Sequence, residues 1–263
     1  MEILRIENVS RVFGGIVAVA DASLSIYKGQ FVGIIGPNGA GKTTLFNCIT
    51  GMYGLSHGNI TLRVNGEFKQ IGNVSPSKIA QYGIARTFQN IRLFEEMTVL
   101  DNIKTAMYHQ YRYGVFSTFF RTKKFKRNES LIHKRAKLWL DEVGLLDKRD
   151  ILASQLSYGE QRRIEIARAL ATGAKMLFLD EPAAGMNEQE TNNLINFIRD
   201  IHKKYDLTIV LIEHDMRLVM GLCDHIVVLD RGICIAAGTP KQIQSNPSVI
   251  AAYLGEEVND VKD

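Results

Sequence analysis

The sequence predicts an α/β fold built on a mostly parallel sheet with helices on both faces. Short continuous apolar runs at 31–35, 176–179 and 208–212 are typical of strands buried on both sides in such a sheet. Helical patterns at 160–172 and 188–204 alternate with these runs along the chain. The first run leads into a glycine-rich loop and then an expected helix, which is the order of a phosphate-binding unit.

Two β segments and one helical segment complete the expected fold. Residues 3–32 mix short alternating runs with turn signals, and we expect them to form an N-terminal antiparallel β layer. The runs 226–229 and 233–236 enclose the turn Asp230-Arg231-Gly232, which predicts a closing hairpin. Residues 90–158 are rich in helical patterns and supply no strong strand, so we expect a helical subdomain inserted in the α/β core.

We therefore expect one domain over residues 1–255. Its α/β core comprises residues 1–89 and 159–255, and the helical subdomain comprises residues 90–158. The polar residues 256–263 are expected to form a flexible tail.

The composition is that of an ordinary globular protein. The 263 residues are 46% hydrophobic and 23% charged, which is sufficient for a sizeable core. No apolar run approaches the ~20 residues that cross a bilayer as a helix. The first residues also lack the basic and then apolar layout of a signal peptide, so we expect the protein in the cytoplasm.

The net charge of +4 hides one basic segment. Residues 105–137 contain nine Lys or Arg and one Glu, a local charge of +8, so the remainder of the chain sums to −4. A whole-surface attraction to nucleic acid is therefore not expected. Phe116, Phe119 and Phe120 follow a helical spacing in this segment, beside five cations. The stripe either contacts membrane subunits or anionic lipid, or it forms a small core with a solvated charged face. The cations are Arg121, Lys123, Lys124, Lys126 and Arg127.

The glycine-rich loop matches the phosphate-loop pattern at every fixed position and lies between an expected strand and an expected helix. Glycines let consecutive N–H groups curl around phosphate oxygens, and the helix N-terminus adds its positive end. Lys42 supplies a full charge near the β- and γ-phosphates, and the Thr43 hydroxyl is a ligand for Mg²⁺. The alternative is a glycine-rich turn with a chance lysine. The predicted nucleotide-binding residues are Gly36, Pro37, Asn38, Gly39, Ala40, Gly41, Lys42, Thr43 and Thr44.

An acidic pair follows the second apolar run. Asp180 ends the run and is expected to hold Mg²⁺ directly or through water. Glu181 comes next and is placed to polarise the attacking water as general base. The alternative is that two acids simply end a strand at the surface. The phosphate loop upstream in the same chain disfavours this alternative. The base-recognition motif Asn-Lys-x-Asp of GTPases is absent from the sequence.

A serine-glycine motif precedes the helical pattern at 160–172. Leu156-Ser-Tyr-Gly-Glu-Gln161 contains a Ser-x-x-Glu capping box, so it could be no more than a helix start. Nineteen residues separate Glu160 from Asp180. Together with the phosphate loop upstream, this arrangement resembles the signature of ABC ATPases, and the resemblance covers nearly the whole chain.

The resemblance implies the ABC ATPase version of the P-loop NTPase fold and a head-to-tail dimer with two composite ATP sites. ATP on the phosphate loop of one subunit would be closed by Ser157, Gly159 and Glu160 of a second ATPase subunit, in a homodimer or a heterodimer. The sequence departs from the commonest Leu-Ser-Gly-Gly-Gln at Tyr158 and Glu160. With a carboxylate, Glu160 is expected to act as an acceptor or helix cap.

Three further positions carry over from the resemblance. Phe13 lies where ABC proteins have an aromatic residue that stacks on adenine, although it could equally be a core residue of the β layer. Gln89 resembles the glutamine that senses Mg²⁺ and the attacking water, where the alternative is a solvent-facing loop residue. His214 resembles the histidine that hydrogen-bonds the γ-phosphate, where the alternative is a structural histidine.

The finer resemblance is to the larger ATPase subunit of bacterial branched-chain amino acid importers. The stretches 156–171, 181–190 and 212–232 carry it. Such systems contain a second ATPase subunit, two membrane permease subunits and a periplasmic substrate-binding protein. The resemblance thus implies a peripheral protein at the cytoplasmic face of the inner membrane that uses ATP and Mg²⁺ to drive import of leucine, isoleucine or valine.

Three other functions remain open. The ATPase of a lipopolysaccharide-export ABC system shares the Ile-Ala-Arg-Ala-Leu helix, but it lacks the long basic insert. A soluble ABC ATPase acting on ribosomes or DNA usually carries two cassettes or a long coiled coil, which this chain lacks. A P-loop small-molecule kinase would leave the serine-glycine signature and His214 unexplained.

Overall fold

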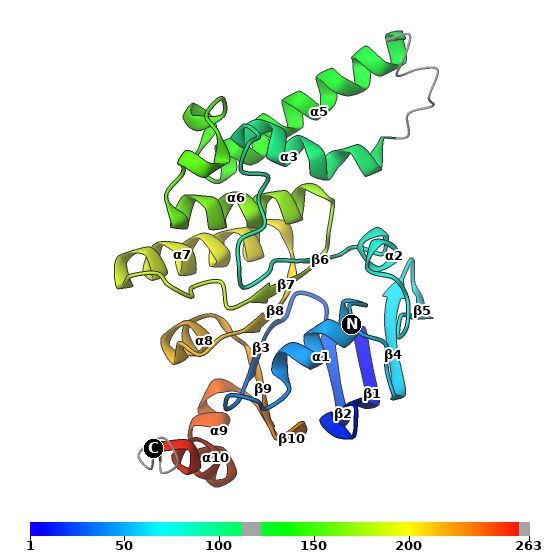
Figure 1. Cartoon of the computed structure of the whole chain (residues 1–263), viewed down its shortest axis with the longest axis vertical. Helices are drawn as coiled ribbons and strands as arrows, with labels where there is room; N and C mark the ends of the chain where they lie inside the picture. The colour runs from blue at the N-terminus through cyan, green and yellow to red at the C-terminus, as the bar shows by residue number, and fades with distance from the viewer. Residues whose placement is uncertain (112–121, 258–263) are drawn as a thin grey trace.

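The computed structural model describes residues 1–111 and 122–257 and contains two sheets with helices between and around them (Figure 1). The core sheet has the strand order β10-β9-β3-β8-β7-β6. Its strands β6, β7, β8, β3 and β9 are parallel, and β10 runs antiparallel to β9. Their bounds are β3 Phe31–Ile35, β6 Ile84–Arg86, β7 Met176–Asp180, β8 Thr208–Ile212, β9 His225–Asp230 and β10 Ile233–Gly238.

The central strands β3, β7 and β8 lie where the apolar runs predict them. Every residue of these three strands is buried, as expected for a sheet covered on both faces. The closing hairpin is also confirmed, as β9 and β10. The short strand β6 at the sheet edge is not anticipated by the sequence pattern, since three residues are too few to show a period.

The second sheet is antiparallel, in the order β2-β1-β4-β5. The expected N-terminal layer supplies only β1 and β2, and two later strands complete it. The bounds are β1 Glu2–Phe13, β2 Ile16–Tyr27, β4 His57–Val64 and β5 Glu67–Gln70. These two sheets enclose one hydrophobic core around helix α1, with Leu4, Ile34, Phe46 and Phe178 among its buried residues.

The helices cover the core sheet and form a separate upper layer in Figure 1, where α3 and α5 lie above α6. Helices α6, α7 and α8 close the face of the core sheet opposite α1. The α-helix bounds are α1 Lys42–Ile49, α2 Pro76–Gln81, α3 Val99–Met107, α5 Lys123–Glu142, α6 Tyr158–Ala171, α7 Glu188–Tyr205, α8 Met216–Leu222, α9 Pro240–Gln244 and α10 Pro247–Glu257. Short 3₁₀ turns occupy Tyr108–Gln110, Leu146–Lys148 and Ala153–Gln155.

Helix α6 joins the helical layer to the α/β core. Its Ile164 packs in a cluster with α3 and α5, whereas its Ile166 packs against the core sheet. The helix thus begins at the boundary expected between the two parts and belongs structurally to both.

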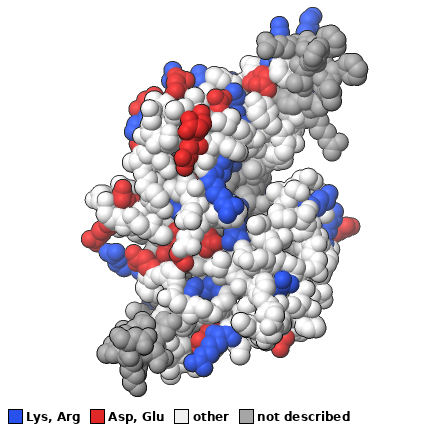
Figure 2. All heavy atoms as spheres, in the orientation of Figure 1, with Lys and Arg blue, Asp and Glu red and all other residues white. Residues whose placement is uncertain are grey.

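The basic segment is described only in part. Phe116, Phe119, Phe120 and Arg121 lie outside the described residues, whereas the other four cations of the stripe begin α5 and are exposed. Figure 2 shows Lys and Arg interspersed with acidic and uncharged residues on one face, rather than as a continuous basic surface. Across residues 1–111 and 122–257, no helix combines the length and the apolar character needed to span a bilayer.

Candidate functional site

The phosphate loop connects the end of β3 to the start of α1, as the sequence predicts. Gly36 and Gly41 have φ of 148° and 93°. A Cβ at Gly36 would lie 1.9 Å from the Leu229 carbonyl oxygen, and one at Gly41 would lie 2.3 Å from that of Ala18. Both positions therefore require glycine for torsion and for space, and the loop is tightly packed on β2 and β9.

Lys42 begins α1 and its side chain folds back over the loop. Its Nζ donates to the carbonyl oxygens of Gly36 and Pro37 at 2.6 and 2.7 Å. A cavity of about 230 Å³ lies beside the loop, and most of the phosphate-loop residues share it with Glu181 and His214. The loop residues that line it are Asn38, Gly39, Ala40, Gly41, Lys42, Thr43 and Thr44. The structure thus brings most of the expected loop, Glu181 and His214 to one cavity, whereas Gln89 and Asp180 do not line it.

Glu181 directly follows β7 and lies at the centre of this site. Its φ of 45° is unusual for a residue other than glycine and indicates local backbone strain, which collects at functional sites. Its backbone N–H donates to Ile212 at the end of the neighbouring strand. Two strand ends therefore fix the position of the carboxylate.

Two expected site residues contact the Glu181 carboxylate from different segments. Gln89 Nε2 donates to Oε2 at 2.8 Å. His214 Nε2 lies 2.8 Å from Oε1, and because a carboxylate only accepts, this nitrogen carries the proton. Gln89 and His214 are thus neither free loop residues nor remote from the acid.

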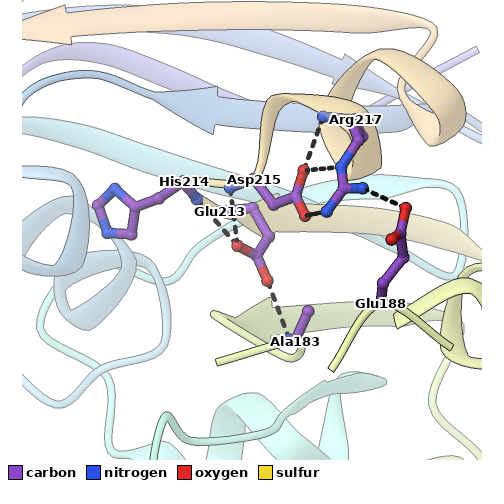
Figure 3. A network of polar contacts seen from close by, with 6 residues as sticks. All are labelled: Ala183, Glu188, Glu213, His214, Asp215 and Arg217. Atoms are coloured by element: carbon purple, nitrogen blue, oxygen red, sulfur yellow. Dashed lines mark hydrogen bonds and ion pairs between the residues drawn. The ribbon is translucent and has the colours of Figure 1, made fainter. Parts of the chain in front are cut away.

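Glu213 orients the His214 segment (Figure 3), although the sequence pattern did not single it out. Its buried carboxylate accepts backbone N–H groups from Ala183, His214 and Asp215, at 2.9, 2.9 and 3.3 Å. Burial raises the pKa of Glu213, although these N–H donors oppose the shift. The residue ties the loop after Glu181 to the loop that carries His214. Its sequence signal is an acid directly after a buried strand, much as Asp180 is the acid that ends one.

Asp180 ends β7 and is buried against an arginine. Arg86 Nη2 lies 2.6 Å from Asp180 Oδ2, and the two side chains are 8% and 6% exposed. Arg86 ends β6, the strand that pairs with β7. No sequence pattern singles out Arg86, because one charged residue at the end of a three-residue strand has no distinctive spacing.

Arg162 attaches the Gln89 segment to helix α6. Its fully buried guanidinium donates to the carbonyl oxygens of Phe88 and Gln89 at 2.7 Å each and pairs with Glu165 at 2.7 Å. Burial raises the pKa of Glu165, and Arg162 offsets only part of that shift. Arg162 was also not anticipated: it lies four residues before the buried Ile166, on the buried face of α6, but a charged side chain there gives no sequence signal of what it contacts.

The serine-glycine motif lies in a different cavity, of about 620 Å³, between the helical layer and α7. Ser157, Gly159 and Glu160 line it, and none of the phosphate-loop residues does. The predicted capping box is present: Glu160 Oε2 accepts the Ser157 N–H at 3.1 Å, and its Oε1 pairs with Lys148 at 2.6 Å. Burial acts against ionisation, but Lys148 and this N–H outweigh it and lower the pKa of Glu160. Within one chain, the two motifs do not meet.

Phe13 ends β1 and is 36% exposed, so the core alternative for this residue is wrong. Its ring packs edge-on against Tyr53, with centroids 5.2 Å apart, and the Arg11 guanidinium lies 4.4 Å from its centroid. One aromatic surface therefore remains accessible near the hairpin that packs on the phosphate loop.

Comparison with known proteins identifies the family of the chain. Residues 19–184 match the family "ABC transporter", and residues 234–259 match "Branched-chain amino acid ATP-binding cassette transporter". The chain is 46% identical, over 97% of its length and 98% of theirs, to the high-affinity branched-chain amino acid transport ATP-binding proteins LivG of Escherichia coli and BraF of Pseudomonas aeruginosa. A probable LivG of Methanocaldococcus jannaschii is 37% identical at the same coverage.

Solved structures show the same fold. The ADP conformation of an ATP-binding cassette of an ABC transporter has a TM-score of 0.82 and 35% identity, over 97% of this chain and 99% of that one. A nucleotide-free ATP-binding cassette has a TM-score of 0.81 and 35% identity, over 96% and 99%. The fold class and the resemblance expected from the motifs are thus confirmed, and the chain belongs to the ABC transporter family as a nucleotide-binding cassette ATPase.

Proposed function

We propose that this protein is one of the ATPase subunits of an importer for branched-chain amino acids. The observation that carries the proposal is the position of Glu181, which lies between Gln89 and His214 in a cavity shared with the phosphate loop. A carboxylate held in this way beside a phosphate-binding loop suits the hydrolysis of a nucleoside triphosphate.

The residues around the cavity have separable roles. The loop N–H groups and Lys42 bind the phosphates, and positive charge there stabilises the transition state. Glu181 accepts a proton from the attacking water as general base. Gln89 and His214 hold the Glu181 carboxylate, and His214 is long enough to turn toward a γ-phosphate. Phe13 offers its exposed ring to adenine.

Mg²⁺ fits the oxygen donors at this site. Thr43 lines the cavity and carries a hydroxyl, Asp180 ends the strand directly before Glu181, and Gln89 has an amide oxygen not used in its bond to Glu181. Mg²⁺ takes one or two protein oxygens together with phosphates and waters, so this small donor set is adequate. Bound there, Mg²⁺ would neutralise charge on the β- and γ-phosphates.

A second ATPase subunit completes each site. Ser157 is exposed at the N-terminus of α6, where a hydroxyl and the positive helix end suit a phosphate. It lies in a different cavity from the phosphate loop of its own chain. A head-to-tail dimer, formed with a copy of this chain or with a related subunit, places one motif opposite the other.

Membrane permease subunits fit a largely apolar groove of about 750 Å³ between α2, the segment after β6, and helices α3 and α6. Ile79, Ala80, Leu93 and Ala106 contribute to its lining, and Arg92 and Arg168 add positive charge. Phe94 lies at the groove and is 53% exposed. An amphipathic segment with apolar and acidic side chains is the occupant that this lining favours. The groove borders Arg86 and Phe88, so a segment seated there contacts the Gln89 loop.

The cargo is inferred from the relatives. Their names specify branched-chain amino acid transport over almost the full length of both chains. This favours leucine, isoleucine or valine import over lipopolysaccharide export, a soluble ABC function or kinase activity. The protein would then bind peripherally at the cytoplasmic face of the inner membrane, and a periplasmic binding protein would deliver the substrate.

The test is uptake of radiolabelled leucine, isoleucine and valine in cells that lack this chain. We expect the wild-type chain to restore uptake and Glu181→Gln to fail. Glu188→Gln is the matched control, because Glu188 is an exposed acid on the nearby helix α7. Unchanged uptake of all three amino acids in the deleted cells would refute the cargo, and restoration by Glu181→Gln would refute the catalytic role.

A further inference from the structure

Arg86 joins three elements of the nucleotide site through a single guanidinium. Nη2 pairs with Asp180 Oδ2 at the end of β7. Nη1 donates to Asn47 Oδ1 at 2.6 Å and to Thr50 Oγ1 at 2.9 Å, both near the end of α1. Helix α1 starts in the phosphate loop, so Arg86 connects the strand-end acid to the helix that carries this loop.

The surroundings hold the guanidinium in one orientation. Its Cζ lies 5.7 Å from the ring centroid of Phe46 and 5.2 Å from that of Phe88. Arginine is planar with donors in a fixed fork, so simultaneous bonds to Asp180, Asn47 and Thr50 define its plane. A lysine at this position has one ammonium and cannot reproduce the fork.

Burial makes this contact more than a surface ion pair. Both side chains are almost fully removed from solvent, and a buried pair of this kind adds little net stability but fixes the geometry of its partners. The bond engages Oδ2 of Asp180 and so restricts where the second oxygen can point. The positive charge also acts on any cation held by the same carboxylate.

We propose that Arg86 is a positioning residue for Asp180 that also weakens the hold of this acid on Mg²⁺. The inference rests on the proposed function, in which Asp180 holds Mg²⁺. The fork sets the carboxylate in the orientation needed for hydrolysis. Its charge keeps Mg²⁺ affinity moderate, so that Mg²⁺ and product can leave after each cycle.

Replacing Arg86 by an uncharged residue should change Mg²⁺ affinity and the hydrolysis rate in opposite directions. Arg86→Met removes the charge, so Mg²⁺ should bind more tightly, while the loosened Asp180 should slow hydrolysis. Even with the screening of bulk water, removing one charge a few ångströms from a divalent ion changes its affinity about five- to tenfold. Burial of the pair reduces the screening, so this figure is a lower estimate. A residue that only supported the fold would instead weaken both properties when removed.

The measurement is binding of a fluorescent ADP analogue to the full chain during a Mg²⁺ titration, beside a titration of the analogue in EDTA. We expect the Mg²⁺ concentration for half-maximal effect to fall at least about fivefold in Arg86→Met. Arg86→Lys keeps the charge, so its Mg²⁺ midpoint should stay within about twofold of the wild type while its ATPase rate falls about tenfold. Binding in EDTA should stay unchanged in both variants, which also reports that they are folded.

Asp180→Asn separates the inference from the proposed function. A weaker Mg²⁺ response in Asp180→Asn, with an unchanged or higher Mg²⁺ midpoint in Arg86→Met, overturns the inference alone. An unchanged Mg²⁺ response in Asp180→Asn overturns the Mg²⁺ role of this acid, and the inference with it. If Arg86→Met does not fold, Arg86→Lys decides the matter, because a wild-type ATPase rate in that variant contradicts the positioning role.

Discussion

Gln89 and Glu181 are 92 positions apart in the sequence, yet Nε2 of the first donates to Oε2 of the second at 2.8 Å. Gln89 lies where the α/β core passes into the helical layer, and its carbonyl oxygen is held by Arg162 of α6. A displacement of α6 relative to the core sheet would therefore change the contact that orients the carboxylate of Glu181. This is a direct structural route from the helical layer to Glu181, the proposed general base.

Glu181→Gln should lower the ATPase rate about 10²- to 10⁴-fold, the usual contribution of a general base. Nucleotide affinity should be retained, because the phosphate loop is unchanged. The amide also places an N–H₂ group against either Gln89 or His214, both of which are donors, so one of the two contacts is lost. Steady-state hydrolysis and equilibrium ATP binding test this together, with Glu188→Gln as control. Normal turnover in Glu181→Gln would mean that another group is the base.

Lys42→Ala should weaken ATP binding about ten- to hundredfold, because charged hydrogen bonds contribute about 1.5–3 kcal/mol. The loop should also loosen, since Nζ no longer holds the Gly36 and Pro37 carbonyl oxygens. Equilibrium binding of a labelled nucleotide measures the effect. Lys175→Ala, at an exposed lysine before β7, is the matched control and should bind normally. Wild-type affinity in Lys42→Ala would contradict the assignment of the loop.

The parts of the fold that the sequence predicts well are those whose signal is local. β3, β7 and β8 are continuous apolar runs, because helices or a second sheet cover both faces. β4 was missed, although it completes the antiparallel sheet with β1. The first residues of β4 are polar and exposed, so the strand shows no apolar run there. Its pairing partner β1 lies about fifty residues earlier in the chain, which a local pattern does not reveal.

The same distinction applies to the site. The phosphate loop and the acid pair are contiguous motifs, so residue order alone identifies them. Arg86 reaches side chains that lie 36 to 94 positions away, and Arg162 reaches backbone carbonyl oxygens 73 and 74 positions away. Such contacts are a property of the folded chain and leave no pattern in a single sequence. Glu213 is the intermediate case, because it follows a buried strand as Asp180 ends one, and that rule would have found it.

Ser157→Arg should abolish hydrolysis without reducing ATP binding to the same chain. In the proposed dimer, the exposed serine would face a nucleotide held by the partner, and a long cationic side chain would prevent closure on it. Hydrolysis and ATP binding, measured on one preparation, separate these effects. Ser154→Arg, at an exposed position in the turn before α6, is the control and should hydrolyse ATP normally. A variant at Ser157 that failed to bind ATP would instead place this motif in the site of its own chain.

Glu213 should make the free energy of unfolding fall as the pH rises above the ordinary carboxyl pKa of 4.5. Its pKa is raised in the folded protein by burial, so between the two pKa values the folded state binds more protons than the unfolded state. The contribution of protonated Glu213 is therefore present below pH 4.5 and lost as the pH rises through its folded pKa.

Denaturant unfolding of the wild type and Glu213→Gln at several pH values between 4.5 and 8 tests this. The stability of the wild type relative to the variant should decrease with pH. Glu188→Gln should show no such trend, because Glu188 is exposed. Glu213→Gln should also reduce ATPase activity, since an amide cannot accept all three N–H groups and His214 is then less well held. A constant stability difference at every pH would show that Glu213 does not titrate differently on folding.

Phe94→Asp should release the protein from its membrane subunits. The side chain lies at the apolar groove and is 53% exposed, so a new charge there opposes an apolar or acidic segment seated in the groove. Phe94 makes a cation–π contact with Arg168, at 5.6 Å, but is not part of a buried core. ATP binding and the folded state of the isolated chain should therefore be unchanged.

The measurement is co-purification of the membrane subunits with a tagged chain, together with sedimentation of the chain with membranes. Ile250→Asp is the control, because Ile250 is 46% exposed on α10 and lies outside the groove. We expect the control to stay bound, while Phe94→Asp remains in the soluble fraction. Full recovery of the membrane subunits with Phe94→Asp would exclude the groove as their docking site, and loss with both variants would point to a general effect of surface charge.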